Sequence, residues 1–368
     1  MTTLTSAAVL REPHGSFTLE QLVLDDPRPD EVLVKIVACG ICQTDAHFRD
    51  QHMPIELPAV LGHEGAGVVE RVGSAVTSVQ PGDHVVLSFN SCGHCAACEN
   101  DHPAYCDHLL SMNFSGVRAD GTSGLADTHG KPVRGRFFGQ SSFATFSLAN
   151  ENNVVKVPKD LPLAMLAPLG CGLQTGAAAV LHALDVPPDA SIAIFGVGAV
   201  GLAAIMASRI ARAATIVAID VNAERLQLAQ ELGATHTINA GASDVAATLR
   251  EISPRGVDFV LDTSGRKESL EAGLSALAIL GKFGFVAFHP AAGAVLDASR
   301  LSAGQSLQGI IQGDATPQEF IPRMLDFYRQ GMFPFEKLVR FYEPNEIDKA
   351  FADAARGAAI KPVIRFEH

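Results

Sequence analysis

The segment that most constrains the fold of this chain is a glycine-rich loop between a buried strand and a helix. The apolar run Ser191–Phe195 leads directly into the sequence GVGAVG, and an alanine-rich stretch of helical length follows. About 20 residues after the loop, Asp220 ends the next apolar run, Thr215–Asp220. This order predicts a βαβ unit within a doubly wound parallel sheet.

Such a loop predicts a dinucleotide site, because glycines let the backbone approach a pyrophosphate at the partially positive end of a helix. Asp220 is expected to accept hydrogen bonds from the adenosine ribose and to repel a 2′-phosphate, which favours NAD over NADP. The alternative is a structural glycine turn with Asp220 as a strand cap, and with Arg225 as an exposed helix charge. The candidate residues are Gly196, Gly198, Val200, Gly201, Asp220 and Arg225.

Two regions of different character divide the 368 residues. The first ~165 are dense in turns and short β-branched runs, which predict an antiparallel, partly closed sheet. These runs are Glu31–Val37, Gly65–Val72 and His84–Leu87. From about Leu163, helical stretches alternate with short strands, as in a parallel sheet wrapped by helices. The strands are Ser191–Phe195, Thr215–Asp220, Asp258–Leu261 and Lys282–Ala287.

The end of the chain is expected to return to the first domain, through a helix over Pro317–Gln330 and a strand over Lys361–Phe366. The predicted domains are therefore 1–165, 166–310 (nucleotide-binding) and 311–368 (the return). The strand Lys282–Ala287 is the expected edge of the parallel sheet.

Composition excludes several classes of protein. The formal net charge is −12, and no run of Lys or Arg stands out, so nucleic acid is not an expected partner. Residues 1–10 lack the pattern of a signal peptide, and the longest apolar region, 192–219, is interrupted by glycines and arginines. We expect a cytoplasmic protein without a membrane span, whose seven cysteines are reduced and available for metal or catalysis.

Four of these cysteines, Cys92, Cys95, Cys98 and Cys106, follow the spacing CxxCxxC-x7-C. Four thiolates in such a lobe can close a tetrahedral zinc with no position left for substrate, so this zinc is predicted to be structural. An iron–sulfur cluster is the competing interpretation. His94 and His102 lie close by in sequence, but four sulfurs already fill the shell, and we expect both to be surface residues.

A second metal site is weakly indicated by spacing alone. Its candidate ligands, Cys42, His63 and Cys171, are scattered over ~130 residues, and a buried cysteine is more often an inert small hydrophobic residue.

The motifs taken together resemble one family. ACGICQTDAH, LGHEGAGVVERVG, PGDHVV, CGHCAAC and GCGLQTG, followed by GVGAVG, are similar to the zinc-dependent medium-chain alcohol dehydrogenases over nearly the whole chain. The nearest resemblance is to benzyl-alcohol and geraniol-type enzymes. It is carried by residues 50–52, 137–143, 168–171 and 328–335.

This resemblance implies a GroES-like distorted antiparallel barrel as the catalytic domain, a Rossmann domain inserted before the tail, and an active site in the cleft. It makes Cys42, His63 and Cys171 the catalytic zinc ligands, with one tetrahedral position left open. Cys39 matches no ligand. The implied accompanying residues are Thr44 (substrate oxygen), His47 (proton relay), Asp45 (support of His63), Glu64 (nearby carboxylate), and Thr175 and Gln43 (cofactor).

The reaction implied is reversible oxidation of an aromatic or allylic primary alcohol to its aldehyde, with NAD and two zinc ions per chain, in a homodimer or homotetramer. An aliphatic alcohol or polyol dehydrogenase of the same superfamily, and a zinc- and NAD-binding redox sensor without turnover, are the alternatives. Two further alternatives stay open: His47 can be an ordinary surface histidine, and Asp45 can be a helix cap. Candidate pocket residues are Phe89, Asn90, Met112 and Phe114, each of which can equally be ordinary packing.

Gln43 departs from the family, which often has Arg or His at this position against the pyrophosphate. A neutral amide holds the cofactor less tightly by charge, so we expect weaker NADH retention and faster product release. Replacement Gln43→Arg should therefore lower the Kd for NADH; a fluorescence titration that finds an unchanged Kd contradicts the hypothesis.

Overall fold

The chain divides into two compact units, which are described separately. The computed structural model describes residues 2–286 and 298–366. The first unit comprises residues 1–171, 316–323 and 336–368, and the second comprises residues 172–315 and 324–335. The break at 171/172 lies close to the boundary at 165/166 expected from composition, and the tail of the chain returns to the first unit in two pieces.

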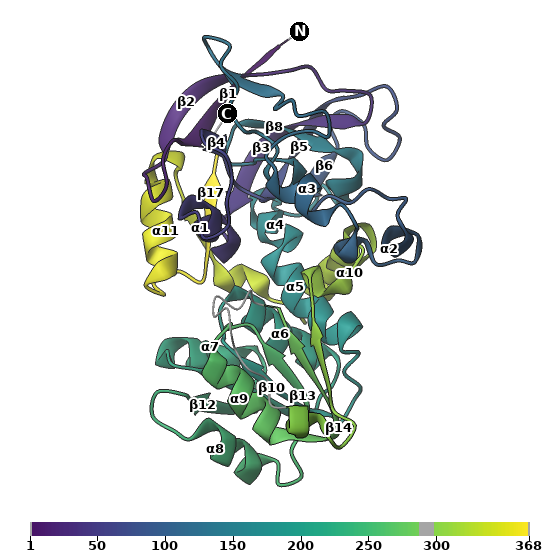
Figure 1. The fold of residues 1–368 in the computed structure, drawn as a ribbon, viewed down its shortest axis with the longest axis vertical. Coiled ribbons are helices and arrows are strands. Elements are labelled where there is room, and N and C mark those ends of the chain that lie inside the picture. The colour runs from purple at the N-terminus through teal and green to yellow at the C-terminus, as the bar shows by residue number, and fades with distance from the viewer. Residues whose placement is uncertain (1, 287–297, 367–368) are drawn as a thin grey trace. The chain divides into compact units, whose positions relative to one another are not determined.

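The first unit is built on two curled sheets, mainly antiparallel (Figure 1). A four-stranded sheet has the order β4-β1-β2-β7, and a seven-stranded sheet has the order β16-β17-β3-β5-β6-β9 with β8 paired to β3. Among the strands that the structure describes in these two sheets, β16 and β17 form the one parallel pair. The strands are β1 (Thr3–Leu10), β2 (Thr18–Leu24), β3 (Glu31–Gly40), β4 (Ala59–Val60), β5 (Glu64–Val72), β6 (His84–Leu87), β7 (Leu125–Asp127), β8 (Phe146–Asn150), β9 (Val154–Val157), β16 (Val339–Tyr342) and β17 (Lys361–Arg365).

Short helices connect these strands. They are α1 (Gln43–Arg49), α2 (Ala96–Glu99), α3 (Leu109–Phe114), α4 (Leu163–Leu166) and α11 (Ile347–Ala355), while α10 (Pro317–Arg329) begins in the first unit and ends in the second.

Strand β3 organises the first unit. Its residues are buried along nearly the whole length, which fits a run of Val, Leu and Ile that packs on both faces. It pairs with β5, β8 and β17, with Gly40 opposite Glu64 of β5 and Val363 of β17. Because β5 and β17 both pair with the Gly40 end of β3, the residues that follow Gly40, precede Glu64 and begin β17 come together.

The second unit is a six-stranded parallel sheet with the order β12-β11-β10-β13-β14-β15. Its strands are β10 (Ser191–Phe195), β11 (Thr215–Asp220), β12 (His236–Asn239), β13 (Val257–Asp262), β14 (Leu277–Phe285) and β15 (Ser306–Gly309). Its helices are α5 (Gly172–Ala178), α6 (Ala199–Ile210), α7 (Ala223–Leu232), α8 (Val245–Ile252) and α9 (Lys267–Ala276) (Figure 1). The predicted fold class, a curled antiparallel domain with a doubly wound parallel sheet, is confirmed.

One expectation about this sheet is wrong. The strand predicted over Lys282–Ala287 is not at the edge, because β14 pairs with β13 on one side and with β15 on the other; Ala287 itself lies outside the described residues. The sequence of β15, Ser306–Gly309, is short and polar and gave no strand signal, so the last pairing was missed.

Within the described ranges, no single helix is long and apolar enough to cross a membrane. The segments Leu163–Gly170 and Gly172–Ala183 reach that length only when both are counted together across a bend.

Candidate functional site

Four sulfur atoms converge in the lobe between β6 and α3. The Sγ atom of Cys98 lies 3.9 Å from that of Cys92 and 3.5 Å from that of Cys95, and Cys95 lies 3.9 Å from Cys106. Backbone amides of Cys92 and His108 donate to the sulfur of Cys106. Such amide donors stabilise thiolates, which are the form that binds metal.

These separations favour zinc over the iron–sulfur cluster that the cysteine spacing left open. With zinc–sulfur bonds of about 2.3 Å, the edges of a tetrahedron are about 3.8 Å long. The observed separations match one zinc ion, whereas an iron–sulfur cluster several ångströms across needs sulfurs further apart. His94 and His102 are exposed, and His94 Nδ1 is hydrogen-bonded to the Cys92 carbonyl. The lobe therefore fits a structural zinc.

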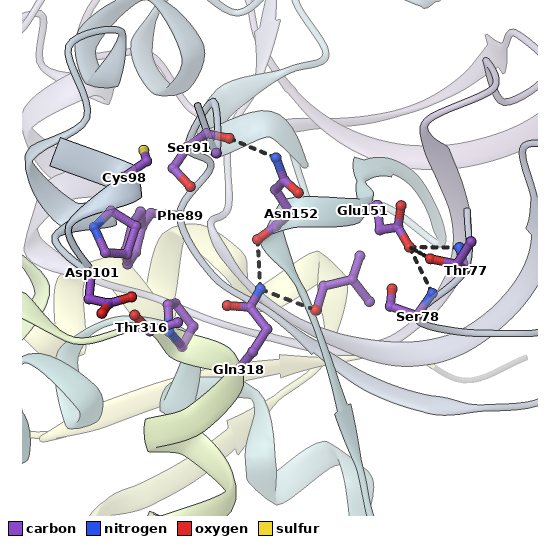
Figure 2. Close-up of a pocket in the computed structure, with 14 residues that line it drawn as sticks. Thr77, Ser78, Phe89, Ser91, Cys98, Asp101, Glu151, Asn152, Thr316 and Gln318 are labelled. Atoms are coloured by element: carbon purple, nitrogen blue, oxygen red, sulfur yellow. Dashed lines mark hydrogen bonds between the residues drawn. The ribbon is translucent and has the colours of Figure 1, made fainter. Parts of the chain in front are cut away.

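A hollow beside this lobe is shown in Figure 2. Its polar groups largely bond to one another: Glu151 accepts from the amides of Thr77 and Ser78, and the Gln318 side chain donates to the carbonyl of Asn152. Cys42, His63 and Cys171 are not among the residues that line it. The Asn152 side chain also donates to the carbonyl of Ser91, so these contacts link the segment that leads into the lobe with the start of α10.

The second cluster gathers Cys42, His63, Glu64 and Cys171, whose ligand atoms all lie within 4.8 Å of one another. His63 Nε2 is 3.3 Å from Cys171 Sγ, and both residues are buried. A hydrogen bond from the Cys171 thiol, together with the nearby imidazole and ammonium, lowers the pKa of Cys42 well below its usual range. Two thiols and an imidazole at this spacing fit a zinc ion with an open position.

Asp45 connects the ligand candidates to the backbone. Its Oδ1 lies 3.0 Å from His63 Nδ1 and accepts from the Gly62 amide, while Oδ2 accepts from the Cys42 amide at the start of α1. The contact at Nδ1 leaves Nε2 of His63 to face the sulfur atoms. The two interpretations of Asp45 are thus compatible: one carboxylate caps α1 and orients the imidazole.

Glu64 forms a buried ion pair with Lys361, the first residue of β17. Lys361 Nζ donates to Glu64 Oε1 at 2.6 Å and to the carbonyl of Ile41 at 3.1 Å, and both side chains are at most 3% exposed. Burial raises the pKa of Glu64 to about 7, and the neighbouring ammonium opposes that rise. Glu64 therefore sits beside the ligand cluster with one oxygen engaged by lysine.

Aromatic rings surround His63. The Phe138 ring stacks on the imidazole with a centroid distance of 4.3 Å, and Phe137 meets it edge-on at 5.6 Å. Phe48 and Phe114 pack behind these two rings. The His63 imidazole is therefore bordered by the apolar faces and edges of aromatic rings.

The predicted pocket residues divide between the two clusters. Phe114 belongs to the aromatic group around His63, and Met112, half-buried, lies on the same helix α3. Phe89 is buried and lines the hollow beside the four-cysteine lobe (Figure 2). Asn90 is held by hydrogen bonds to Asn113 and Asn150. Phe89 thus borders the hollow, and Asn90 links helix α3 to strand β8.

Helix α1 carries three more predicted residues. The Thr44 hydroxyl lies 3.7 Å from Cys42 Sγ. His47 is half-buried and packs edge-on to His52, with ring centroids 5.7 Å apart; burial and this second histidine lower the pKa of His47. Gln43 is exposed at the first position of α1.

The glycine loop of the second unit has the geometry of a phosphate cradle. Gly196 has φ +82°, and a Cβ atom on Gly201 would lie 1.9 Å from the Gly196 carbonyl, so both positions require glycine. A Cβ on Gly198, the N-cap of α6, would meet no atom within 4 Å. The helix end is therefore open to a ligand, as a pyrophosphate requires.

Asp220 is tied into this loop. Its carboxylate accepts from the amides of Val197 and Asn222, which leaves further lone pairs for a ribose. Arg225 is half-buried in the first turn of α7, and its Nε lacks a hydrogen-bond partner in the described structure. Thr175 donates to Gln312 Oε1 at 3.3 Å, and Val200 lies in the first turn of α6.

Sequence reasoning assigned no role to Lys361, Phe138 or Gln140. Lys361 was placed only as the first residue of a strand, and Phe138 and Gln140 only within a resembling segment. The lysine at the start of this short strand is the one local signal available. The partners near the cluster lie far away in sequence, since His63 is 77 positions from Gln140 and Glu64 is 297 positions from Lys361.

Two family models and a curated relative match this chain over long stretches. Residues 28–159 match the alcohol dehydrogenase GroES-like domain, and residues 199–330 match the zinc-binding dehydrogenase family. The chain is 46% identical to geraniol dehydrogenase of Castellaniella defragrans, over 98% of this chain and 97% of that protein.

Two solved structures agree with this assignment. The chain is similar to an alcohol dehydrogenase zinc-binding domain protein from Burkholderia ambifaria, with a TM-score of 0.98, 48% identity and full coverage of both chains. It is also similar to benzyl alcohol dehydrogenase from Acinetobacter calcoaceticus, with a TM-score of 0.95 and 45% identity over 99% of this chain and 100% of that one.

Proposed function

Because this chain belongs to the zinc-binding alcohol dehydrogenase family, we propose that it oxidises aromatic or allylic primary alcohols reversibly to aldehydes with NAD. The observation that carries the proposal is the cluster of Cys42, His63 and Cys171 beside Thr44 and a group of aromatic rings. The names of the relatives, geraniol dehydrogenase and benzyl alcohol dehydrogenase, support the substrate class.

Cys42, His63 and Cys171 would hold the catalytic zinc, and the four-cysteine lobe would hold a second ion. When bound, the zinc acts as a Lewis acid that lowers the pKa of the alcohol. The Thr44 hydroxyl would accept the proton of the substrate alcohol while it passes on its own, and His47, with its pKa lowered by burial, would release a proton to solvent. Asp45 keeps His63 in the tautomer that presents Nε2.

The proposed cofactor is NAD, which takes up the hydride. Gly196, Gly198 and Gly201 would leave room for the pyrophosphate at the start of α6, and the carboxylate of Asp220 would favour an unphosphorylated ribose. Arg225 lies one turn after Asp220, where its guanidinium is available to the same ribose.

The aromatic surroundings of His63 favour a flat, apolar substrate. A polyol needs polar partners for several hydroxyl groups, and each buried hydroxyl left unpaired costs about 1–3 kcal/mol. Phe138 and Phe137 offer ring faces and edges, which pair well with a benzyl, cinnamyl or geranyl group.

The test is NAD reduction at 340 nm on protein of known zinc content, with benzyl alcohol, cinnamyl alcohol, geraniol, ethanol and sorbitol, and with NADP in parallel. We expect two zinc ions per chain and the highest kcat/KM on the first three alcohols with NAD. Activity confined to ethanol or sorbitol would overturn the substrate class, and two bound zinc ions without any turnover would favour a sensor.

Replacing Phe138 by alanine should lower kcat/KM for benzyl alcohol about tenfold while changing that for ethanol less, because about 1.4 kcal/mol of ring contact is lost only by the aromatic substrate. The matched control is Phe143→Ala, which removes a buried ring that packs against Phe17 and Phe351. Equal losses on both alcohols in Phe138→Ala would contradict a role in specificity.

A further inference from the structure

Gln140 is a fully buried amide whose hydrogen-bonding capacity is completely used. Its Nε2 donates to the carbonyls of His63 and Ser88, both at 2.9 Å. Its Oε1 accepts from the amide of Gly65 at 3.1 Å and from the hydroxyl of Ser142 at 2.7 Å. The Gln140 side chain thus bonds to the backbone of His63 and Gly65, which flank the first residue of β5. It also bonds to Ser88, the residue that follows β6.

The segment after β6 continues this chain of contacts towards Cys171. The Ser88 hydroxyl donates to the carbonyl of Gly170 at 2.7 Å, and Gly170 directly precedes Cys171. Continuous hydrogen bonds therefore run from the backbone of His63 through Gln140 and Ser88 to the peptide bond of Cys171. At the other end of this path, His63 Nε2 and Cys171 Sγ lie 3.3 Å apart.

The local backbone holds Gln140 in place at some cost. Phe138 and Ser141 have φ of +53°, a conformation that side-chain-bearing residues rarely adopt. The Ser141 hydroxyl bonds to the Phe137 amide and to the Val60 carbonyl, which fixes this turn. Gly65 allows the close approach, since a Cβ there would lie 2.4 Å from Ser142 Oγ. Strained backbone persists only where the surrounding contacts hold it, and such segments concentrate at functional sites. The contacts around Gln140 are therefore typical of a functional constraint.

From this geometry we infer that Gln140 is a positioning residue, which acts through Ser88 to set the separation between His63 and Cys171 and so the shape of the zinc site. The inference rests on the proposed function only in taking these two residues, with Cys42, as zinc ligands. Ligand orientation by an outer layer of hydrogen bonds commonly changes metal affinity by 10- to 100-fold.

The chain contains its own reference for this test, because the four-cysteine lobe should keep its zinc when only the second site is disturbed. Gln140→Met replaces the amide with an apolar side chain of similar length. It removes the Gln140 donor from the carbonyls of His63 and Ser88, and Ser88 keeps only the longer bond from Asn153, at 3.4 Å. We expect zinc at the cluster of Cys42, His63 and Cys171 to be removed by a chelator at about tenfold lower concentration, and one zinc per chain to resist as in the parent.

Cobalt substitution supplies a second measurement that does not depend on turnover. The visible absorption of Co(II) reports the geometry of its thiolate and imidazole ligands, so the bands of the exchanged site should shift in Gln140→Met. Ser88→Ala removes only the hydroxyl that bonds to Gly170, and it should shift the same bands in a protein that folds even if Gln140→Met does not.

Asn113→Leu is the matched control, because Asn113 is an equally buried amide that clamps Asn90 and the carbonyl of Leu109. It should leave the Co(II) bands of the exchanged site unchanged, even if the melting temperature falls. Unchanged bands and chelator resistance in both Gln140→Met and Ser88→Ala would overturn the inference, as would identical shifts in Asn113→Leu. If the parent binds two zinc ions but oxidises no alcohol, the proposed function fails while these metal measurements still decide the role of Gln140.

Discussion

Replacing Cys171 with alanine should reduce the zinc content from two ions to one per chain and lower kcat/KM on benzyl alcohol by at least about a thousandfold. The sulfur removed lies 3.3 Å from His63 Nε2, and it is one of three side chains proposed to hold the catalytic ion. Loss of the Lewis acid forfeits several kcal/mol of transition-state stabilisation, and three decades of rate correspond to about 4 kcal/mol. Metal analysis and initial rates on the same preparation give both numbers.

Cys39→Ala is the matched control for this variant. Cys39 is also fully buried, three positions before Cys42, but its sulfur bonds to the carbonyl of Gly40 and belongs to neither ligand cluster. The control should keep two zinc ions and near-parental turnover. A Cys171→Ala protein that keeps two zinc ions, or a parent protein that binds only one, would contradict the assignment of the site.

Local geometry agrees with the sequence analysis where the signal is contained in one short segment. The turn at Gly196, the open position at Gly198 and the acidic end of β11 are set by neighbouring residues, and the structure places them as expected. The cysteines of the lobe lie within 15 residues of one another, and their sulfurs converge at zinc spacing. Local geometry decides both features, so the pattern alone was sufficient to predict them.

Contacts made by distant residues could not be predicted in this way. Gln140 bonds to His63, 77 positions away, and Lys361 bonds to Glu64, 297 positions away. Neither contact produces a periodic pattern in the sequence. The wrong edge strand has the same cause, since only three-dimensional pairing reveals β15 beside β14. Even the ligand set of Cys42, His63 and Cys171 depended on a family resemblance, because scattered residues carry no spacing rule.

The second large effect is expected from replacing Lys361, and the effect on stability can be measured separately from the effect on turnover. Lys361→Met removes an ammonium that is 3% exposed and leaves Glu64 buried without its counter-charge. Breaking a buried pair from one side costs about 3–5 kcal/mol, whereas replacing both partners with apolar residues is often nearly neutral. We therefore expect Lys361→Met to lower the denaturant midpoint of the first unit strongly, and Glu64→Leu/Lys361→Met to recover most of the loss.

The same variants should differ in turnover, because Glu64 belongs to the ligand cluster. Its side chain lies within 4.8 Å of the ligand atoms of Cys42, His63 and Cys171, while Lys361 engages Oε1. Without the lysine, this carboxylate can compete for the open coordination position, so Lys361→Met should keep two zinc ions yet lose activity, and the double variant should regain part of it. If instead the single variant loses its zinc, the pair serves to hold the ligands; if it keeps both stability and activity, the ion pair has no function at this site.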